Sequence, residues 1–347
     1  MTLHITNEVN ATLNSIIEGG NYNTAMTLVD TNTRELVLPL LPCLKGLNII
    51  EIGPGDGNKT IDTLTSVWRE MERCGATRHS LLVNLGGGTV TDLGGFAAAT
   101  FKRGIDFINV PSTLLGAVDA AVGGKTGINF NGLKNEIGAF APAIDVIVST
   151  CFFPTLPEQE LKSGFAEMLK HAMLHSRESL KQLLNFDFQN IDYENLLNVL
   201  QESLQVKQHI VEQDPTEQGI RKALNLGHTV GHAFESKALS DGSPVPHGYA
   251  VAWGLVVETV LSHMKLGFPS GDLYSLARFV KDNYGTFYIT CDHYDPLIDL
   301  MRHDKKSRDG EINCTLLKAS GSITINNDIG TDDIKAALDI YRDLMGI

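Results

Sequence analysis

The chain has 347 residues, of which 43% are hydrophobic and 20% are charged, and its net charge is −13. This length suggests about two domains, and the composition is ordinary for a globular protein with buried cores. The acidic balance argues against a nucleic acid or an anionic membrane as partner, but it leaves room for a local basic pocket. Five cysteines without a CxxC pair argue against a disulfide framework or a zinc ribbon, and favour a reducing compartment such as the cytoplasm.

The first part of the chain alternates between predicted strands and predicted helices, and its N-terminus has no pattern of a secretory signal. Strands are expected at 25–29, 47–52, 81–85, 106–110 and 144–148, and helices at 61–73, 89–101 and 113–122. Such alternation forms βαβ units. We therefore predict an α/β fold with a doubly wound, mostly parallel sheet in a nucleotide-binding domain over residues 1–153.

Beyond Pro154 the patterns become helical. Helices are expected at 156–184, 193–213, 224–239, 248–266, 272–283 and 332–345, with a hairpin of strands 312–317 and 322–326. Residues 249–261 are the most apolar stretch, but Glu258 interrupts them and they are too short to span a bilayer. We predict a core helix there, and a mainly α-helical second domain over residues 154–347.

Residues 81–95, LLVNLGGGTVTDLGG, join an apolar strand, a glycine cluster and a helix. Glycines let the backbone approach a pyrophosphate, and the helix N-terminus offers N–H groups and a favourable dipole. The pattern is not GxGxxG, so an ordinary glycine-rich turn is the alternative. Asp92 can cap the helix or bind a ribose or an amide, and taken alone it favours capping. Ser112 or Thr113 can cap the next helix, or contact a nucleotide at the same sheet edge.

Residues 118–138 place Asp119, Lys125, Lys134 and Asn135 around two glycine turns. A glycine-rich loop with two lysines suits an anionic ligand, and a solvated surface loop is the alternative. Arg103, just before a predicted strand, is open to the same two interpretations.

Residues 164–176, GFAEMLKHAMLHS, predict a largely apolar helix on which Glu167, Lys170 and His171 share a face. A Glu–Lys pair at this spacing is usually a modest surface ion pair. Here the apolar neighbours predict partial burial, which favours a functional role.

Residues 221–235, RKALNLGHTVGHAFE, carry five polar groups at helical spacing. If the segment is one helix, these groups form a single stripe on a mostly buried surface: Arg221, Asn225, His228, His232 and Glu235. Each buried polar group without a partner would cost about 1–3 kcal/mol, so a metal, an anionic ligand or a hydrogen-bond network must meet the stripe. Two histidines bonded to nearby carbonyls are the simpler alternative, but five groups in register favour a site.

His247 opens another apolar helix. With Glu167 and His228 it would form a two-histidine, one-carboxylate set, which suits zinc or a related divalent ion with an open position. Spacing alone does not select this set, because His228 and His232 look like the more natural pair. Taken singly, several other charged residues look like solvated surface groups: Lys207, Asp214, Glu217, Lys305 and Lys306.

Together these stretches resemble the 3-dehydroquinate synthase family. Six blocks carry the resemblance in the family's order: GGGTVTDLGGFAAATFKRG, PSTLLGAVDAAVGGKTGINFNGLKN, GFAEMLKHA, residues 207–235, PHGYAVAWG and HDKK. The resemblance covers residues 25–320, nearly the whole chain, and is more specific than any single motif. It implies the fold of that family, with an NAD-binding domain followed by a helical domain.

The resemblance also implies ligands and site residues. A divalent ion, zinc or cobalt, would be held by Glu167, His228 and His247, and His232 would contact the phosphonate or phosphate end of the substrate. NAD would touch Asp30, Asp56, Lys59, Gly87, Gly88, Asp92, Ser112, Thr113, Lys125 and Lys134. The substrate pocket would include Asp119, Lys125, Asn135, Lys170, Lys207, Glu217, Arg221, Asn225, Lys305 and Lys306. Arg103 would reach a substrate phosphate from the partner subunit, which implies a homodimer.

Two positions depart from the family pattern. Asp56, in PGDGNK, stands where the family usually has Glu, and one methylene less weakens a contact to the adenosine part of NAD. Gly116 and Ala117 replace bulkier residues, and the sequence offers no reason for that change.

The implied activity converts 3-deoxy-D-arabino-heptulosonate 7-phosphate into 3-dehydroquinate and phosphate, in the shikimate route to aromatic amino acids. NAD would take a hydride and return it after phosphate has left. Four groups favour this over related cyclases acting on sedoheptulose 7-phosphate or glucose 6-phosphate: Lys125, Arg221, Asn225 and His232. Two further alternatives are a metal-dependent polyol or glycerol-phosphate dehydrogenase, and a nucleotide-binding regulator built on an inactive enzyme.

Overall fold

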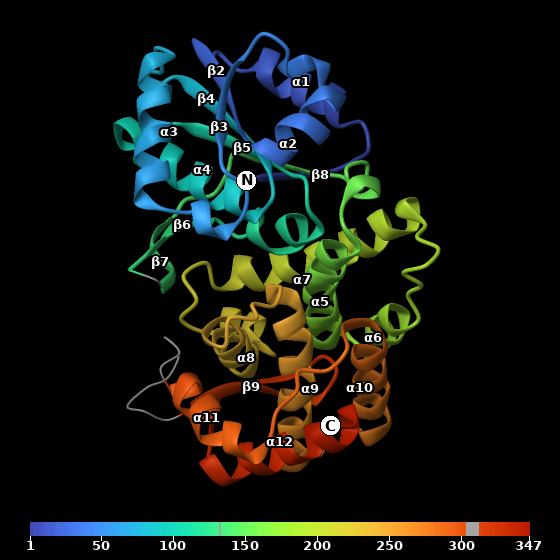
Figure 1. Cartoon of the computed structure of the whole chain (residues 1–347). Helices are drawn as coiled ribbons and strands as arrows, with labels where there is room; N and C mark the ends of the chain where they lie inside the picture. Colours follow the sequence, from blue (N-terminus) through green and yellow to red (C-terminus); the bar gives the residue numbers. More distant parts are fainter. Residues whose placement is uncertain (132, 303–311) are drawn as a thin grey trace. The chain divides into compact units, whose positions relative to one another are not determined.

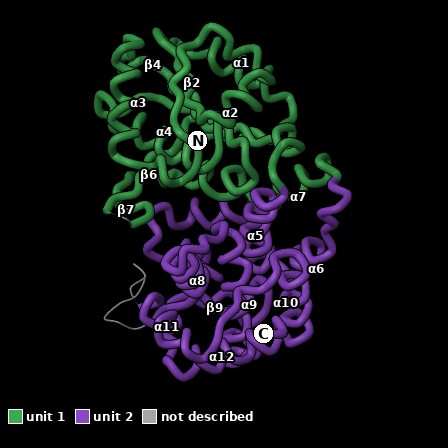
Figure 2. Tube along the Cα trace, viewed as in Figure 1, with its two compact units in different colours: residues 1–157, 192–204 green, residues 158–191, 205–347 purple. Residues whose placement is uncertain are grey.

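The structure is a computed structural model that describes residues 1–131, 133–302 and 312–347. It divides into two compact units (Figure 2): unit 1 is Met1–Pro157 with Asp192–Leu204, and unit 2 is Glu158–Ile191 with Gln205–Ile347. The division falls inside helix α7 (Tyr193–Gln213), so this helix contributes to both units. The predicted functional domains, 1–153 and 154–347, stay predictions.

Unit 1 is organised around a six-stranded sheet in the order β1-β8-β5-β4-β2-β3 (Figure 1), and every neighbouring pair in it is parallel. Its strands are β1 (Thr2–Ile5), β2 (Thr24–Asp30), β3 (Asn48–Ile52), β4 (Ser80–Gly86), β5 (Asp106–Pro111) and β8 (Asp145–Val148). β4 is buried along its whole length, as expected for a central parallel strand covered on both faces. The five predicted strands are confirmed, and the short β1 was not predicted.

The order of the strands creates a switch point between β2 and β4. From β2 the chain adds β3 on one side, and then crosses back to add β4 and β5 on the other side. In such sheets a crevice for ligands opens at the carboxyl ends of the two strands where the direction reverses. These ends carry Asp30 and Gly86, which places the predicted nucleotide contacts at the expected edge.

Three helices of unit 1, α2, α3 and α4, begin after a capping side chain or a glycine. The α-helices of this unit before α7 are α1 (Val9–Gly19), α2 (Thr31–Leu36), α3 (Ile61–Arg73) and α4 (Gly88–Thr100), with short 3-10 turns η1 (Leu38–Leu40), η2 (Pro42–Leu44), η3 (Asp56–Asn58), η4 (Phe101–Arg103) and η6 (Phe153–Thr155). α3 has the predicted bounds, because Thr60 caps it by accepting from the Thr63 N–H and one face is buried.

Two predictions for unit 1 need correction. Residues 118–138, predicted as a glycine-rich loop, contain an antiparallel hairpin of β6 (Lys125–Phe130) and β7 (Leu133–Phe140). Gly127 lies opposite Gly138, and a Cβ on Gly127 would come within 2.6 Å of the Ile137 carbonyl oxygen. The glycines that allow this close pairing also hide the alternation from sequence analysis.

The helix predicted at 113–122 is shorter than expected: residues 114–120 are helical, and most of them form a π-helical turn, η5 (Gly116–Ala120). It packs closely against the start of α4: a Cβ on Gly116 would lie 3.3 Å from the Gly88 backbone nitrogen. This contact supplies a physical reason for glycine at 116, where the sequence offered none.

Unit 2 is mainly helical, with one hairpin. Its elements are α5 (Glu158–His175), α6 (Arg177–Leu184), the second half of α7, η7 (Ile220–Asn225), α8 (His228–Ser240), α9 (His247–Leu266), α10 (Ser270–Tyr284), η8 (Cys291–His293), α11 (Tyr294–Arg302), β9 (Ile312–Ala319), β10 (Ser322–Ile329) and α12 (Thr331–Met345). α9 is buried from Ala250 to Ser262 and forms the core, as predicted. The hairpin of β9 and β10 is confirmed. The predicted helix 156–184 breaks at Ser176, which caps α6, and α11 was not predicted.

The helix predicted over 224–239 is confirmed from His228 onward, but its predicted start is wrong, and so is the continuous stripe from Arg221 to Glu235. Arg221 and Asn225 lie in the 3-10 helix η7, and α8 starts only at His228. The break lies at Gly227, whose φ of 80° is left-handed and ends any continuous helix. The two segments therefore present their side chains independently.

Within the residues that the structure describes, every helix lacks the length and apolar character needed to cross a membrane.

Candidate active site

Three candidate metal ligands from three helices meet in unit 2. Glu167 lies in α5, while His228 and His247 are the first residues of α8 and α9. Glu167 Oε1 is 3.3 Å from His228 Nε2 and 3.6 Å from His247 Nε2. Bonds of about 2.0–2.1 Å in a tetrahedral zinc site would hold ligand atoms about 3.4 Å apart. The spacing therefore suits a small divalent ion with little rearrangement.

The outer nitrogens of both imidazoles have acceptors that orient the rings. His228 Nδ1 donates to the Leu226 carbonyl oxygen at 3.1 Å, and His247 Nδ1 lies 3.1 Å from Glu235 Oε2. A neutral imidazole that donates through Nδ1 keeps its lone pair on Nε2, the nitrogen that faces Glu167. This is the arrangement in which outer partners fix the tautomer and direction of metal-binding histidines.

Glu167 supplies the test of whether a cation fits. Its side chain is fully buried, and neither carboxylate oxygen has a hydrogen bond of good geometry, although Lys170 forms an ion pair with Oε2. Two imidazole nitrogens and a buried carboxylate oxygen facing one another require a positive charge between them, which a proton on His247 or a metal ion can supply. Carboxylate and imidazole are also a donor set that zinc and cobalt accept.

The charged neighbours of His247 and Glu167 shift the pKa values of both groups. Burial lowers the pKa of His247, but the neighbouring carboxylates of Glu167 and Glu235 outweigh it and raise this pKa to about 9. Burial raises the pKa of Glu167, but Lys170 and His228 outweigh it and hold this pKa well below its ordinary value. The carboxylate is therefore charged at neutral pH and attracts a cation.

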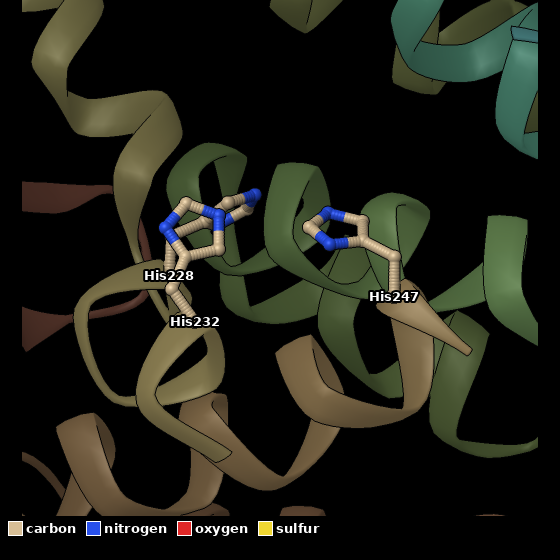
Figure 3. A group of neighbouring side chains, drawn as sticks. All are labelled: His228, His232 and His247. Atoms are coloured by element: carbon tan, nitrogen blue, oxygen red, sulfur yellow. The ribbon is translucent and has the colours of Figure 1, made fainter. Parts of the chain in front are cut away.

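His232 borders the candidate ligands His228 and His247. Its ring centroid lies 5.4 Å from that of His228 and 5.8 Å from that of His247. Figure 3 shows the three rings turned toward a common space, and one nitrogen from each lies within 4.8 Å of the others. The geometry thus keeps His232 close enough to act on anything bound there.

Buried cations in unit 2 suit an anionic ligand. Lys170, Lys207 and Arg221 are 1%, 4% and 3% exposed. Lysine and arginine are rarely buried unless they meet negative charge. Asn225, in the same 3-10 helix as Arg221, donates to Glu217 Oε1 at 3.0 Å, and Glu217 has a left-handed φ of 61°. The structure thus brings together Asn225 and Glu217, two residues that the resemblance assigned to the substrate pocket.

Asp214, which sequence analysis treated as a surface charge, organises the segment before Arg221. Its carboxylate accepts from the backbone N–H groups of Gln218 at 3.0 Å, Gly219 at 2.7 Å and Arg221 at 3.0 Å. Burial raises the pKa of Asp214, but these hydrogen bonds together outweigh burial, so the pKa lies below its ordinary value. The Asp214-Pro215 pair, with Gly219 a few residues later, is a turn signal that could have identified this role.

In unit 1, Lys59 connects two of the predicted cofactor and substrate contacts. Its Nζ lies 2.5 Å from Asp92 Oδ2 and also donates to Asn135 Oδ1. The prediction that Asp92 caps the helix is wrong. The N-cap of α4 is Gly87, and Asp92 lies a full turn into the helix, where its carboxylate pairs with Lys59.

The neighbouring positions lie along the same sheet edge. Thr113 caps the turn that follows β5, because its hydroxyl accepts from the Gly116 N–H at 3.0 Å. The Ser112 N–H donates to the Gly86 carbonyl oxygen at 2.9 Å, which joins β5 to the glycine turn. Asp30 caps α2 by accepting from the Thr33 N–H at 2.8 Å.

The remaining predicted residues of unit 1 lie on its loops and hairpin. Asp56 accepts from Asn129 Nδ2 at 3.0 Å and lies 3.8 Å from Lys134 Nζ. Lys125 begins β6, Asp119 lies in η5, and Arg103 ends η4 with an exposed side chain and a left-handed φ of 72°. Lys305 and Lys306 lie outside the described residues.

Comparisons with known sequences find the same family along nearly the whole chain. The family model described as 3-dehydroquinate synthase N-terminal matches residues 49–163, and that described as 3-dehydroquinate synthase C-terminal matches residues 164–307. A 3-dehydroquinate synthase from Parabacteroides distasonis is 46% identical over 346 residues, covering 99% of this chain and 98% of the relative. One from Pyrococcus abyssi is 38% identical over 322 residues, covering 91% and 93%.

Solved structures share the fold at lower identity. A 2-deoxy-scyllo-inosose synthase, solved with carbaglucose-6-phosphate, NAD+ and Co2+, has a TM-score of 0.83 at 21% identity and covers 97% of this chain and 95% of its own. A 2-epi-5-epi-valiolone synthase from Streptomyces hygroscopicus subsp. jinggangensis, solved with NAD+ and Zn2+, has a TM-score of 0.82 at 23% identity, covering 98% and 96%. An iron-containing alcohol dehydrogenase from Thermotoga maritima has a TM-score of 0.64 at 12% identity, covering 100% and 98%. The two family models and the full-length similarity show that the chain belongs to the 3-dehydroquinate synthase family.

Proposed function

We propose that this protein is a 3-dehydroquinate synthase that uses NAD and one divalent metal ion. It converts 3-deoxy-D-arabino-heptulosonate 7-phosphate into 3-dehydroquinate and phosphate, in aromatic amino acid biosynthesis. The observation that carries the proposal is the convergence of Glu167, His228 and His247 on one buried point. The full-length similarity to curated enzymes of that name supports the choice of substrate.

In unit 2, one group of residues would bind the metal ion and another would bind the charged groups of the substrate. Glu167, His228 and His247 would hold the ion, and Lys170 would balance the carboxylate from the opposite oxygen. When bound, the ion acidifies a hydroxyl and polarises a ketone, and NAD accepts and returns a hydride. Lys207, Arg221 and Asn225 would hold the carboxylate and phosphate, which supplies orientation and charge neutralisation.

The residues of unit 1 would hold NAD. The glycine turn at Gly87 and Gly88 lets the pyrophosphate approach the N-terminus of α4. Asp30, at the end of β2, would contact a ribose, and the pair of Lys59 and Asp92 would orient the rest of the cofactor. Asp56 would meet the adenosine part, with Lys134 beside it.

The remaining predictions concern the assembly and its place in the cell. We propose a homodimer in which Arg103 reaches the partner's substrate, and the exposed left-handed turn at Arg103 supports a role beyond packing. A cytoplasmic location fits the free thiols of all five cysteines. Sedimentation of the purified protein would test the dimer.

The decisive experiment measures phosphate release from the heptulosonate phosphate, with NAD supplied and then omitted. A 3-dehydroquinate synthase forms dehydroquinate and phosphate in equal amounts and leaves no net NADH. Steady accumulation of NADH would instead support a polyol or glycerol-phosphate dehydrogenase, and turnover only with sedoheptulose 7-phosphate or glucose 6-phosphate would support a related cyclase. Chelation should abolish activity and zinc or cobalt should restore it, which separates an enzyme from an inactive regulator.

A further inference from the structure

Helices α8 and α9 each begin with a candidate metal ligand, His228 in one and His247 in the other. The relative placement of these two helices therefore decides whether both imidazoles face Glu167. Glu258 lies in the buried part of α9 and takes no part in the proposed chemistry, yet it contacts the start of α8.

The contact is a cap supplied by a neighbouring helix. Glu258 is fully buried, and its Oε2 accepts from the Gly227 N–H at 2.7 Å while Oε1 accepts from the Val230 N–H at 3.2 Å. The first N–H groups of an α-helix have no partner inside the helix. Gly227, at the N-cap, has no side chain to satisfy them. Glu258 does so from α9, with both carboxylate oxygens engaged.

Three glycines let the two helices come close enough for this contact. We call Gly227, Gly231 and Gly254 the glycine contact. A Cβ on Gly254 would overlap the Gly227 carbonyl oxygen, one on Gly231 would lie 3.0 Å from the Ala250 carbonyl oxygen, and one on Gly227 would lie 2.7 Å from Leu255 Cδ2. The backbones of α8 and α9 thus touch directly, one residue before the candidate ligand His228.

We propose that Glu258 is a positioning residue for the metal centre, because its cap fixes the first turn of α8 and so aims His228 at Glu167. The inference rests on the proposed function, since it takes His228 to be a ligand. The negative carboxylate also interacts favourably with the positive, N-terminal end of the α8 dipole. Glutamine could not replace it, because its amide has one acceptor oxygen and would turn an NH2 group toward one of the two N–H donors.

The test compares Glu258→Gln with Thr259→Val. Thr259 is equally buried on the same helix, and its hydroxyl donates within α9 to the Leu255 carbonyl oxygen at 2.6 Å. Both changes therefore remove a buried polar interaction of α9, but only the first removes one that reaches α8. Three quantities are measured: the dissociation constant for Co2+, the visible absorption spectrum of the Co2+-saturated protein, and the Tm of the metal-free protein.

We expect Glu258→Gln to weaken Co2+ binding by roughly tenfold to a hundredfold and to alter the Co2+ spectrum. Thr259→Val should leave both at wild-type values even where it lowers the Tm. Wild-type affinity and spectrum in Glu258→Gln would overturn the inference while the proposed function stands. A wild-type protein that binds no Co2+ would overturn the proposed function itself, and the inference with it.

Glu258→Asp keeps the experiment informative if the glutamine variant does not fold. Aspartate preserves the buried charge but withdraws the carboxylate by one methylene, so the two hydrogen bonds lengthen. We expect a smaller loss of Co2+ affinity than with glutamine, together with a shifted spectrum. An unshifted spectrum with unchanged affinity would contradict the positioning role.

Discussion

The candidate metal site of unit 2 and the candidate nucleotide site of unit 1 are built from different kinds of groups. In unit 2, single donor atoms from three helices converge, and Leu226 and Glu235 hold the imidazoles from behind. In unit 1, the central feature is backbone: a glycine turn between a buried strand and the start of α4. The first site should lose its metal ion when a donor side chain is removed. The second should lose affinity for NAD when atoms are added to the glycine turn.

The largest effect should follow from removing one donor in unit 2. His228→Ala should lose the divalent ion and lower kcat by on the order of 10³-fold, since a metal acting as a Lewis acid is worth several kcal/mol. Metal content by elemental analysis and phosphate release check both parts. A variant that keeps its metal and its rate would show that the three-helix site is not the centre of the chemistry.

His232→Ala tests whether His232 is a metal ligand or a substrate contact. We expect Co2+ affinity to stay near the wild-type value while kcat/KM falls by roughly tenfold to a hundredfold, the effect of one lost hydrogen bond to a charged group. Steady-state kinetics on the Co2+-loaded protein provide the measurement, with His228→Ala as the matched comparison. Loss of the ion on changing His232 would make it a ligand, as its spacing from His228 first suggested.

Adding atoms should be the damaging change in unit 1. A Cβ on Gly87 would already lie 3.1 Å from Thr113 Cγ2, so Gly87→Val crowds the turn that would receive the pyrophosphate. Overpacking of about 1–3 kcal/mol would weaken NAD binding by roughly tenfold to a hundredfold and leave metal content unchanged. Gly19→Val is the control, because a Cβ at Gly19 has open space around it. Equal NAD affinity in both variants would refute the backbone interpretation.

The smallest effect should come from removing one charge in unit 1. Asp92→Asn keeps the shape of the side chain but weakens its bond with Lys59, and a difference of about 0.5–1.5 kcal/mol would change the NAD dissociation constant by roughly twofold to tenfold. Titration calorimetry with NAD measures it. A loss as large as that in Gly87→Val would mean that side chains, and not backbone, dominate this site too.

Regular elements were predictable because their signals are local. α3 and α7 have the predicted bounds of 61–73 and 193–213, since capping residues and an apolar face at helical spacing lie within each segment. β4 was predictable for the same reason, as an apolar run that ends in glycines. The hairpin of β6 and β7 was not, because paired glycines interrupt its alternation.

The candidate metal site was only partly predictable from the residues. His228 and His232 were identifiable from their spacing in one helix, but Glu167 and His247 come from other helices, and only the resemblance to a family selected the set. The break before His228 depends on the left-handed Gly227 and on a cap from Glu258, far along the chain. Contacts of this kind are tertiary, and no local pattern contains them.

The glycine contact between α8 and α9 limits how this scaffold can diverge. In a library that randomises both helices under selection for growth without aromatic amino acids, positions 227, 231 and 254 should return as glycine. Solvent-facing positions of α8, such as Leu239, should drift freely. New substrate preferences would then arise through the side chains that line the pocket, while the angle between the two helices that carry His228 and His247 is inherited unchanged.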